Sequence, residues 1–148
     1  MKNPFMDNYI ITELQPHDYY NGFLELLEQL TFVGTNKITY HDFIYQLNQM
    51  KPKEVLVIKL NNKVVATASI FIEKKFTHHL SSVGHIEDIV VDKNYRGKGL
   101  GKFLVDHCIE HSKNNGCYKV ILSSDKKNME FYKKCGFENK NNEMCIYF

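Results

Sequence analysis

The chain has 148 residues, of which 43% are hydrophobic and 24% charged, and its formal net charge is +2. This length fits one domain, residues 1–148, which is large enough to bury a core without disulfide bonds. So small a net charge gives no support for nucleic-acid binding by the molecule as a whole, so any basic site must be local.

The chain offers neither a membrane segment nor a cysteine framework. No apolar run is long enough to span a bilayer, and MKNPFMDNYI at the start lacks the apolar stretch of a secretory signal. Cys108, Cys117, Cys135 and Cys145 are scattered and form no C-x-x-C pair, which argues against a zinc site. We therefore expect reduced thiols, no metal, no membrane and a cytoplasmic location.

Hydrophobic patterning predicts that the first half of the chain forms a strand, two helices and two further strands. These elements cover residues 9–14, 16–31, 40–50, 54–60 and 63–75. Asn61 and Asn62 separate the last two strands and tolerate left-handed backbone. We therefore expect those two strands to form a hairpin.

The second half alternates strands with helices. The predicted elements are a strand, a helix, a strand, a short helix and a final strand, over residues 84–92, 100–113, 117–124, 126–137 and 143–148. Gly116 and Gly136 lie where the two helices should stop. The resulting order, β-α-α-β-β-β-α-β-α-β, predicts an α/β protein with a mixed sheet.

NYRGKGLGK (94–102) has three glycines at alternate positions among basic residues. It fails the P-loop pattern, because Arg96 replaces the first glycine and Phe103 replaces the Ser/Thr. It also fails the dinucleotide pattern G-x-G-x-x-G from either starting glycine. The loop nevertheless joins a predicted strand to a helix N-terminus, where unpaired N–H groups favour an anion. A basic, solvated turn is the alternative.

Two motifs carry a resemblance to a known superfamily. VVDKNYRGKGLGKFLVD resembles the [QR]-x-x-G-x-[GA] motif of the GNAT acetyltransferases, with Arg96, Gly99 and Gly101 in register. NMEFYKKCGF resembles their N-x-x-F-Y-x-x-x-G-F signature. The resemblance implies a GNAT fold, a mixed central β-sheet flanked by helices, with acetyl-CoA bound at a splay between two central parallel strands.

Further segments narrow the resemblance. GHIEDIVV, GLGKFLVD, GCYKVIL and KNMEFYKKCGF together are similar to the glucosamine 6-phosphate N-acetyltransferase family. The resemblance implies transfer of acetyl from acetyl-CoA to the 2-amino group of D-glucosamine 6-phosphate, on the route to UDP-N-acetylglucosamine. It also implies a homodimer with its active sites at the subunit junction.

The resemblance assigns site residues by position. The acetyl-CoA residues are Ile89, Val90, Val91, Arg96, Gly97, Lys98, Gly99, Leu100, Gly101, Asn128 and Tyr132. The sugar-phosphate residues are Thr31, Lys75, His78, Glu87, Asp88, Tyr118 and Lys119. Glu87 would accept the proton of the amine, and Tyr132 would donate its O–H to the leaving thiolate.

Each assignment has a structural alternative. Glu87 and Asp88 could be surface charges at a bulge, Tyr132 could pack in the core, and Lys119 could be a solvent-facing strand residue. His78 and His79 could form a metal pair, but neighbouring strand residues face opposite ways, which argues against it.

Two positions depart from the narrower family. Ser123 stands where the family has an acidic residue, and Tyr147 where it has an arginine near the C-terminus. A serine cannot be an ionised base, and a tyrosine brings no charge to a phosphate. Two other functions therefore stay open: acetyl transfer to a different amine, such as a protein terminus or polyamine, and acyl-CoA sensing without catalysis.

Overall fold

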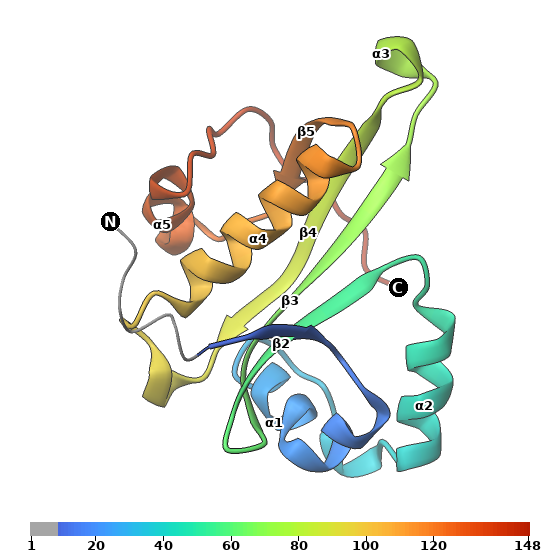
Figure 1. Ribbon diagram of the computed structural model, residues 1–148, viewed down its shortest axis with the longest axis vertical. Coiled ribbons are helices and arrows are strands. Elements are labelled where there is room, and N and C mark those ends of the chain that lie inside the picture. Colours follow the sequence, from blue (N-terminus) through green and yellow to red (C-terminus); the bar gives the residue numbers. More distant parts are fainter. Residues whose placement is uncertain (1–8) are drawn as a thin grey trace.

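The computed structural model describes residues 9–148, and its centre is a five-stranded mixed sheet (Figure 1). The strands follow the chain order in space and are β1 (Ile11–Glu13), β2 (Glu54–Leu60), β3 (Lys63–Lys74), β4 (Ser82–Val91) and β5 (Cys117–Leu122). The first four pair in antiparallel fashion, and β4 pairs with β5 in parallel. The predicted α/β class and mixed sheet are confirmed.

Two hairpins build the middle of the sheet. Asn61 and Asn62 take φ values of 49° and 65°, so the left-handed turn expected between β2 and β3 is present. The longer β3–β4 hairpin extends beyond the rest of the molecule and ends in the single turn α3 (Thr77–Leu80) (Figure 1). The sequence patterns did not predict this turn, in which three successive residues, His78 to Leu80, have positive φ.

Helices cover both faces of the sheet. On one face α4 (Leu100–Asn114) packs on β3, β4 and β5, with Leu100, Leu104 and Cys108 in the core. On the other face α1 (Phe23–Leu27) and α2 (Tyr40–Gln49) enclose a second core. The two cores alternate along β2, with Leu56 in the first and Val57 in the second, as strand geometry requires. None of the described helices is both long and apolar enough to cross a bilayer.

Two predicted helices are shorter and broken. Residues 16–31 form a 3₁₀ segment, Pro16–Asn21, followed by α1, because Gly22 between them adopts a left-handed φ of 81°. Residues 126–137 form a 3₁₀ turn, Lys126–Asn128, that leads into α5 (Met129–Lys134). Two more 3₁₀ turns cover Thr35–Lys37 and Lys93–Tyr95.

The prediction of a final strand over residues 143–148 is wrong for the single chain. The segment has no strand assignment, and Met144, Ile146 and Tyr147 are 80–94% exposed. A strand needs a neighbour to pair with, and hydrophobic composition cannot supply one. As a result β5 forms an edge of the sheet.

Candidate active site

β4 separates from its parallel neighbour partway along its length. Pairing between the two strands runs from Ser82 with Cys117 to Ile86 with Leu122, where β5 ends, whereas β4 continues to Val91. Among the described residues, no strand pairs with this edge of β4 from Glu87 to Val91. Its backbone N–H and C=O groups can therefore pair with an extended ligand. Ile89, Val90 and Val91, assigned to acetyl-CoA, lie here.

A bulge marks the start of this open segment. Ser69 pairs with Glu87 but Thr67 pairs with Val90, so β4 has one residue more than β3 between these pairs. Asp88 takes a φ of 52°, an uncommon conformation for a residue with a side chain. The bulge brings two exposed carboxylates, Glu87 and Asp88, to the point where the strands part.

The glycine loop, residues 94–102, connects β4 to the N-terminus of α4. Gly97 and Gly99 have φ values of 76° and 85°, which glycine adopts without a steric penalty. Gly99 is the N-cap of the 15-residue helix, and no side chain caps it. The first N–H groups of α4 thus have no capping side chain, and the helix dipole favours an anion beside them.

Gly101 allows close packing at the start of α4. A Cβ at this position would lie 3.2 Å from the Phe131 ring and 3.6 Å from a Val91 methyl. The glycine therefore keeps the helix start against both β4 and α5. This is the kind of cradle that a pyrophosphate group can approach closely.

The charged residues of the loop have defined partners. Arg96 donates from Nε to the Val91 carbonyl at 3.0 Å, which ties its side chain to the end of β4. Lys98 Nζ lies 5.1 Å from the centroid of the Tyr95 ring. Arg96 therefore lies beside the end of β4, and Lys98 directly precedes Gly99, the N-cap of α4.

Asp92 anchors the loop to the rest of the molecule. Its buried carboxylate accepts from the Asn94 N–H at 2.9 Å and from Lys63 Nζ at 2.9 Å. The Asn94 hydrogen bond first, and then Lys63, hold the pKa of Asp92 below its ordinary value. The next residue, Lys93, donates its N–H to Gln29 Oε1 at 2.9 Å.

Tyr132 lies on α5, next to the residue that faces Gly101. Its ring is 5.0 Å from Phe131 and 6.2 Å from Phe137 in edge-to-face arrangements. Burial raises the pKa of the Tyr132 phenol, so the group is protonated at neutral pH and can donate a hydrogen bond. Asn128 is the N-cap residue of the same helix.

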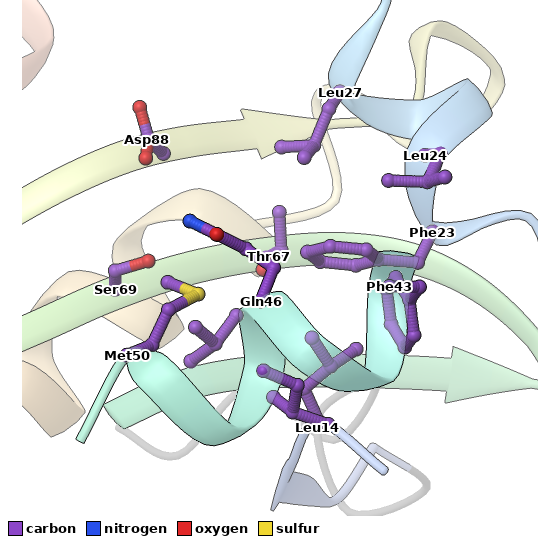
Figure 2. Close-up of a pocket in the computed structure, with 12 residues that line it drawn as sticks. Leu14, Phe23, Leu24, Leu27, Phe43, Gln46, Met50, Thr67, Ser69 and Asp88 are labelled. Atoms are coloured by element: carbon purple, nitrogen blue, oxygen red, sulfur yellow. The ribbon is translucent and has the colours of Figure 1, made fainter. Parts of the chain in front are cut away.

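Two cavities lie on the sheet face that α1 and α2 partly cover. The first, of about 140 Å³, has an apolar floor that includes Phe23, Leu24 and Phe43, while Ser69 and Asp88 lie on the β3–β4 side (Figure 2). The second, of about 440 Å³, is more polar and is lined by Met50, Pro52, Lys53, Phe71, Glu73, His85 and Glu87. The bulge residues thus divide between them: Asp88 lines the first and Glu87 the second.

Four residues that line the second cavity, Lys53, Glu73, His85 and Glu87, together with Lys75, which contacts Glu73, define a mixed-charge face. Lys53 Nζ lies 3.7 Å from Asp88 Oδ2. Glu73 contacts both Lys75 Nζ and His85 Nε2, each at 2.7 Å. Hydrogen bonds from Lys75 first, and then from His85, keep the pKa of Glu73 below its ordinary value. Glu87 has no ion pair within the part of the chain that the structure describes.

Three of the predicted sugar-phosphate residues, His78 at the tip of the β3–β4 hairpin and Tyr118 and Lys119 on β5, lie close together. The rings of His78 and Tyr118 stack at 3.9 Å between centroids, with an interplanar angle of 22°. Lys119 Nζ lies 5.5 Å from the Tyr118 centroid. We had expected His78 and His79 to face opposite ways as neighbours in a strand. The positive φ of His78 places it in a turn, so this argument against a metal pair does not apply. No group of three or more metal-ligating side chains occurs within residues 9–148.

The site residues predicted from the sequence thus form two continuous regions, and one residue, Thr31, lies apart from both. The acetyl-CoA residues follow β4, the glycine loop and α5, and most sugar-phosphate residues lie on β4, the hairpin tip and β5. Thr31 is exposed after α1 and lines neither cavity. Sequence reasoning missed Lys53, Glu73 and His85. Strand alternation could have found the last two, because residues 71 and 73 share a face with 85 and 87.

Comparisons with known proteins agree with this geometry. The family model described as the acetyltransferase (GNAT) family matches residues 17–137. Glucosamine 6-phosphate N-acetyltransferase of Arabidopsis thaliana is 40% identical over 148 aligned positions, covering 96% of this chain and 98% of that protein. The protein of the same name from Candida albicans is 39% identical and covers 95% of this chain and 96% of its own length.

A solved structure gives the same result. The crystal structure of the Arabidopsis thaliana glucosamine-6-phosphate N-acetyltransferase superposes with a TM-score of 0.90 at 41% identity. The match covers 95% of this chain and 99% of that one. The shared fold therefore extends over almost the whole chain.

Proposed function

Because the chain belongs to the acetyltransferase (GNAT) family, we propose that it transfers acetyl from acetyl-CoA to the 2-amino group of D-glucosamine 6-phosphate. The products are N-acetyl-D-glucosamine 6-phosphate and CoA, which places the reaction in UDP-N-acetylglucosamine biosynthesis. The observation that carries this proposal is the open edge of β4, which runs from a carboxylate-bearing bulge to the glycine loop. A cytoplasmic location is part of the proposal.

The donor half of the site follows from the open edge. The pantetheine arm of acetyl-CoA pairs with the backbone of Ile89, Val90 and Val91 and brings its thioester toward the bulge. The pyrophosphate lies against the N–H groups of residues 96–101, where the helix dipole stabilises negative charge. Asn128 borders the arm from the N-terminus of α5.

The chemistry needs one proton acceptor and one donor. A protonated amine cannot attack a thioester, and Glu87 is the carboxylate at the bulge that can accept its proton, directly or through water. The N–H near Ile89 stabilises the thioester oxygen as negative charge develops on it. Tyr132, kept protonated by burial, donates its O–H to the leaving thiolate.

The acceptor half relies on charges of both signs. An amino sugar phosphate carries an ammonium group and a phosphate, and the mixed-charge face supplies carboxylates beside cations. Ser123 follows the end of β5, and its neutral hydroxyl adds no charge near the amine. Asp125 pairs loosely with Lys127 at 3.9 Å. Glu87 is therefore the carboxylate we assign to the amine.

We also propose that the protein works as a homodimer. Phe148, together with Met144, Ile146 and Tyr147, forms an exposed apolar end of the chain, and no strand among the described residues pairs with the outer edge of β5. Pairing of residues 143–148 with a second copy would bury these side chains and satisfy both sets of backbone groups. Light scattering should give twice the mass of one chain, and Ile146→Asp should give a monomer. A wild-type monomer would refute this.

The reaction is tested by following CoA thiol release with acetyl-CoA and D-glucosamine 6-phosphate. We expect release with the wild-type protein and about 100-fold slower turnover for Glu87→Gln. Asp106→Asn, which changes an exposed carboxylate on α4, is the matched control.

An acceptor panel separates the two other functions. Faster turnover with a polyamine or a peptide terminus would favour acetyl transfer to that amine. Calorimetric binding of CoA without turnover on any amine would favour an acyl-CoA sensor. Either result would end the assignment of glucosamine 6-phosphate as the acceptor.

A further inference from the structure

The 140 Å³ cavity is lined by apolar side chains that the proposed mechanism does not use. Most belong to α1 or to α2 and its C-cap: Phe23, Leu24, Leu27, Phe43, Leu47 and Met50 (Figure 2). Thr67 of β3 also lines it, but its hydroxyl donates to the Leu56 carbonyl at 2.7 Å and is thus paired within the sheet. The space between the helices and the sheet is therefore suited to an apolar group.

The cavity reaches the bulge of β4, where the proposed function places the thioester. Asp88 lines the cavity, and the next residue is Ile89, near which an N–H stabilises the thioester oxygen. α1 packs against β4, and Figure 2 shows Leu27 extending from α1 beside the strand that carries Asp88. The acyl carbon thus lies next to the mouth of the cavity.

The two cavities meet at the bulge and divide the substrates between them. Glu87 lines the 440 Å³ cavity, Asp88 lines the 140 Å³ cavity, and Met50 lines both. The amine approaches from the side of Glu87, because that carboxylate accepts its proton. The acyl chain, attached to the carbon under attack, then points away from the amine and toward the 140 Å³ cavity.

The size and lining of this cavity fit a short hydrocarbon chain. An apolar cavity of about 150 Å³ lined by Leu, Ile and Phe stays dry and binds benzene, a six-carbon ring. The methyl of an acetyl group would leave most of a 140 Å³ space empty. Asp88 brings a charge to the rim, but its partner Lys53, at 3.7 Å, lines only the other cavity. Each further methylene buried between the helices should strengthen binding about 4-fold.

We propose that the protein also transfers propionyl and butyryl groups from their CoA thioesters, with the acyl chain bound in the 140 Å³ cavity. This inference rests on the proposed acetyl transfer and extends the class of donor. The amine nitrogen, once Glu87 has taken its proton, forms an amide bond with the acyl carbon. The C–S bond breaks with its electron pair on sulfur, and Tyr132 protonates the thiolate, which leaves CoA and an N-acyl amino sugar phosphate.

The test measures kcat/KM for acetyl-, propionyl-, butyryl- and octanoyl-CoA at saturating D-glucosamine 6-phosphate, with each product identified by its mass. We expect wild-type kcat/KM for butyryl-CoA to be within about 10-fold of that for acetyl-CoA, because the added methylenes are buried. Octanoyl-CoA overfills the cavity and should be at least about 10-fold poorer than butyryl-CoA. Leu27→Phe fills the space that the chain needs, so kcat/KM should fall about 10-fold for butyryl-CoA and stay within about 2-fold for acetyl-CoA.

The controls separate failure of this inference from failure of the proposed function. Leu30→Phe makes the same change three residues further on, where the side chain lines neither cavity, and should alter neither donor. If Leu27→Phe does not fold, Leu27→Ala enlarges the cavity and should raise kcat/KM for octanoyl-CoA about 10-fold.

Three results would overturn this inference alone. They are acetyl transfer without any N-butyryl product, butyryl transfer that Leu27→Phe leaves unchanged, and an equal loss with both donors in that variant. A wild type inactive on glucosamine 6-phosphate with every acyl-CoA would overturn the proposed function as well.

Discussion

The glycine loop and the mixed-charge face differ in how their residues come together. The loop takes its groups from one continuous segment, residues 94–102, anchored by Asp92 just before it. The mixed-charge face takes Lys53 from the start of the β2 region, Glu73 and Lys75 from β3 or its end, and His85 and Glu87 from β4. Local sequence can specify the first, whereas the second exists only when the strands pair in the correct register.

The two regions also differ in what holds them. The loop depends on its backbone conformation and on a helix N-terminus. A substitution that alters this conformation, or that fills the space beside a glycine, should therefore abolish the proposed binding of acetyl-CoA. The mixed-charge face depends on ion pairs between partly exposed side chains, which contribute little to stability. Substitutions in the face should therefore change kinetics more than folding.

Gly101→Val should have the largest effect, because its Cβ would already lie 3.2 Å from the Phe131 ring and its two methyl groups need further space. We expect Kd for acetyl-CoA to rise about 1,000-fold, which corresponds to roughly 4 kcal/mol of binding free energy. Calorimetric titration measures it. Gly116→Ala is the control, because it strains a left-handed glycine after α4 that has open space around it. Equal loss of affinity in both variants would contradict the close-packing explanation.

Tyr132→Phe should lower kcat about 100-fold and leave the affinity for acetyl-CoA nearly intact, because only the proton donor is removed. Steady-state kinetics and calorimetry on the same preparation give the two numbers. Phe137→Leu, which changes a neighbouring ring without removing a donor, is the control. Unchanged turnover would remove Tyr132 from the mechanism and leave it a packing residue.

Asp92→Asn should weaken the anchor of the loop. We expect a loss of about 1–2 kcal/mol in the free energy of unfolding at pH 7, because Lys63 loses its charged partner. The folded-state pKa of Asp92 lies below the ordinary 3.8, so its stabilisation is complete above that pH and disappears as the pH falls through the folded-state value. Urea unfolding at pH 7 and pH 3 measures the difference, which must shrink at the lower pH.

Asp106→Asn should have the smallest effect. Lys102 and Asp106 are 2.6 Å apart on the surface of α4, but their side chains are 52% and 50% exposed. Solvent screens such i,i+4 pairs, so the free energy of unfolding should change by less than about 0.5 kcal/mol. A larger loss in urea unfolding would mean that the helix start is held by charge and not by packing.

Particular elements mark the limits of prediction from sequence. The strands over 54–60 and 63–75 and the helix over 100–113 were predicted to within one residue at each end, because their hydrophobic periodicity is long and regular. Gly22 broke the helix predicted over 16–31, since one left-handed residue outweighs the periodicity on either side of it. The final strand failed because an edge strand is specified by its neighbour.

The sequence by itself determined the glycine loop, since its glycines, cations and following helix are contiguous, and the motifs that mark the GNAT acetyltransferase family. Only the tertiary structure decided that β4 parts from β5 after Ile86, that a bulge presents Glu87 and Asp88 there, and that Glu73 joins His85 to Lys75. These features depend on strand register, which long-range packing fixes and local composition does not.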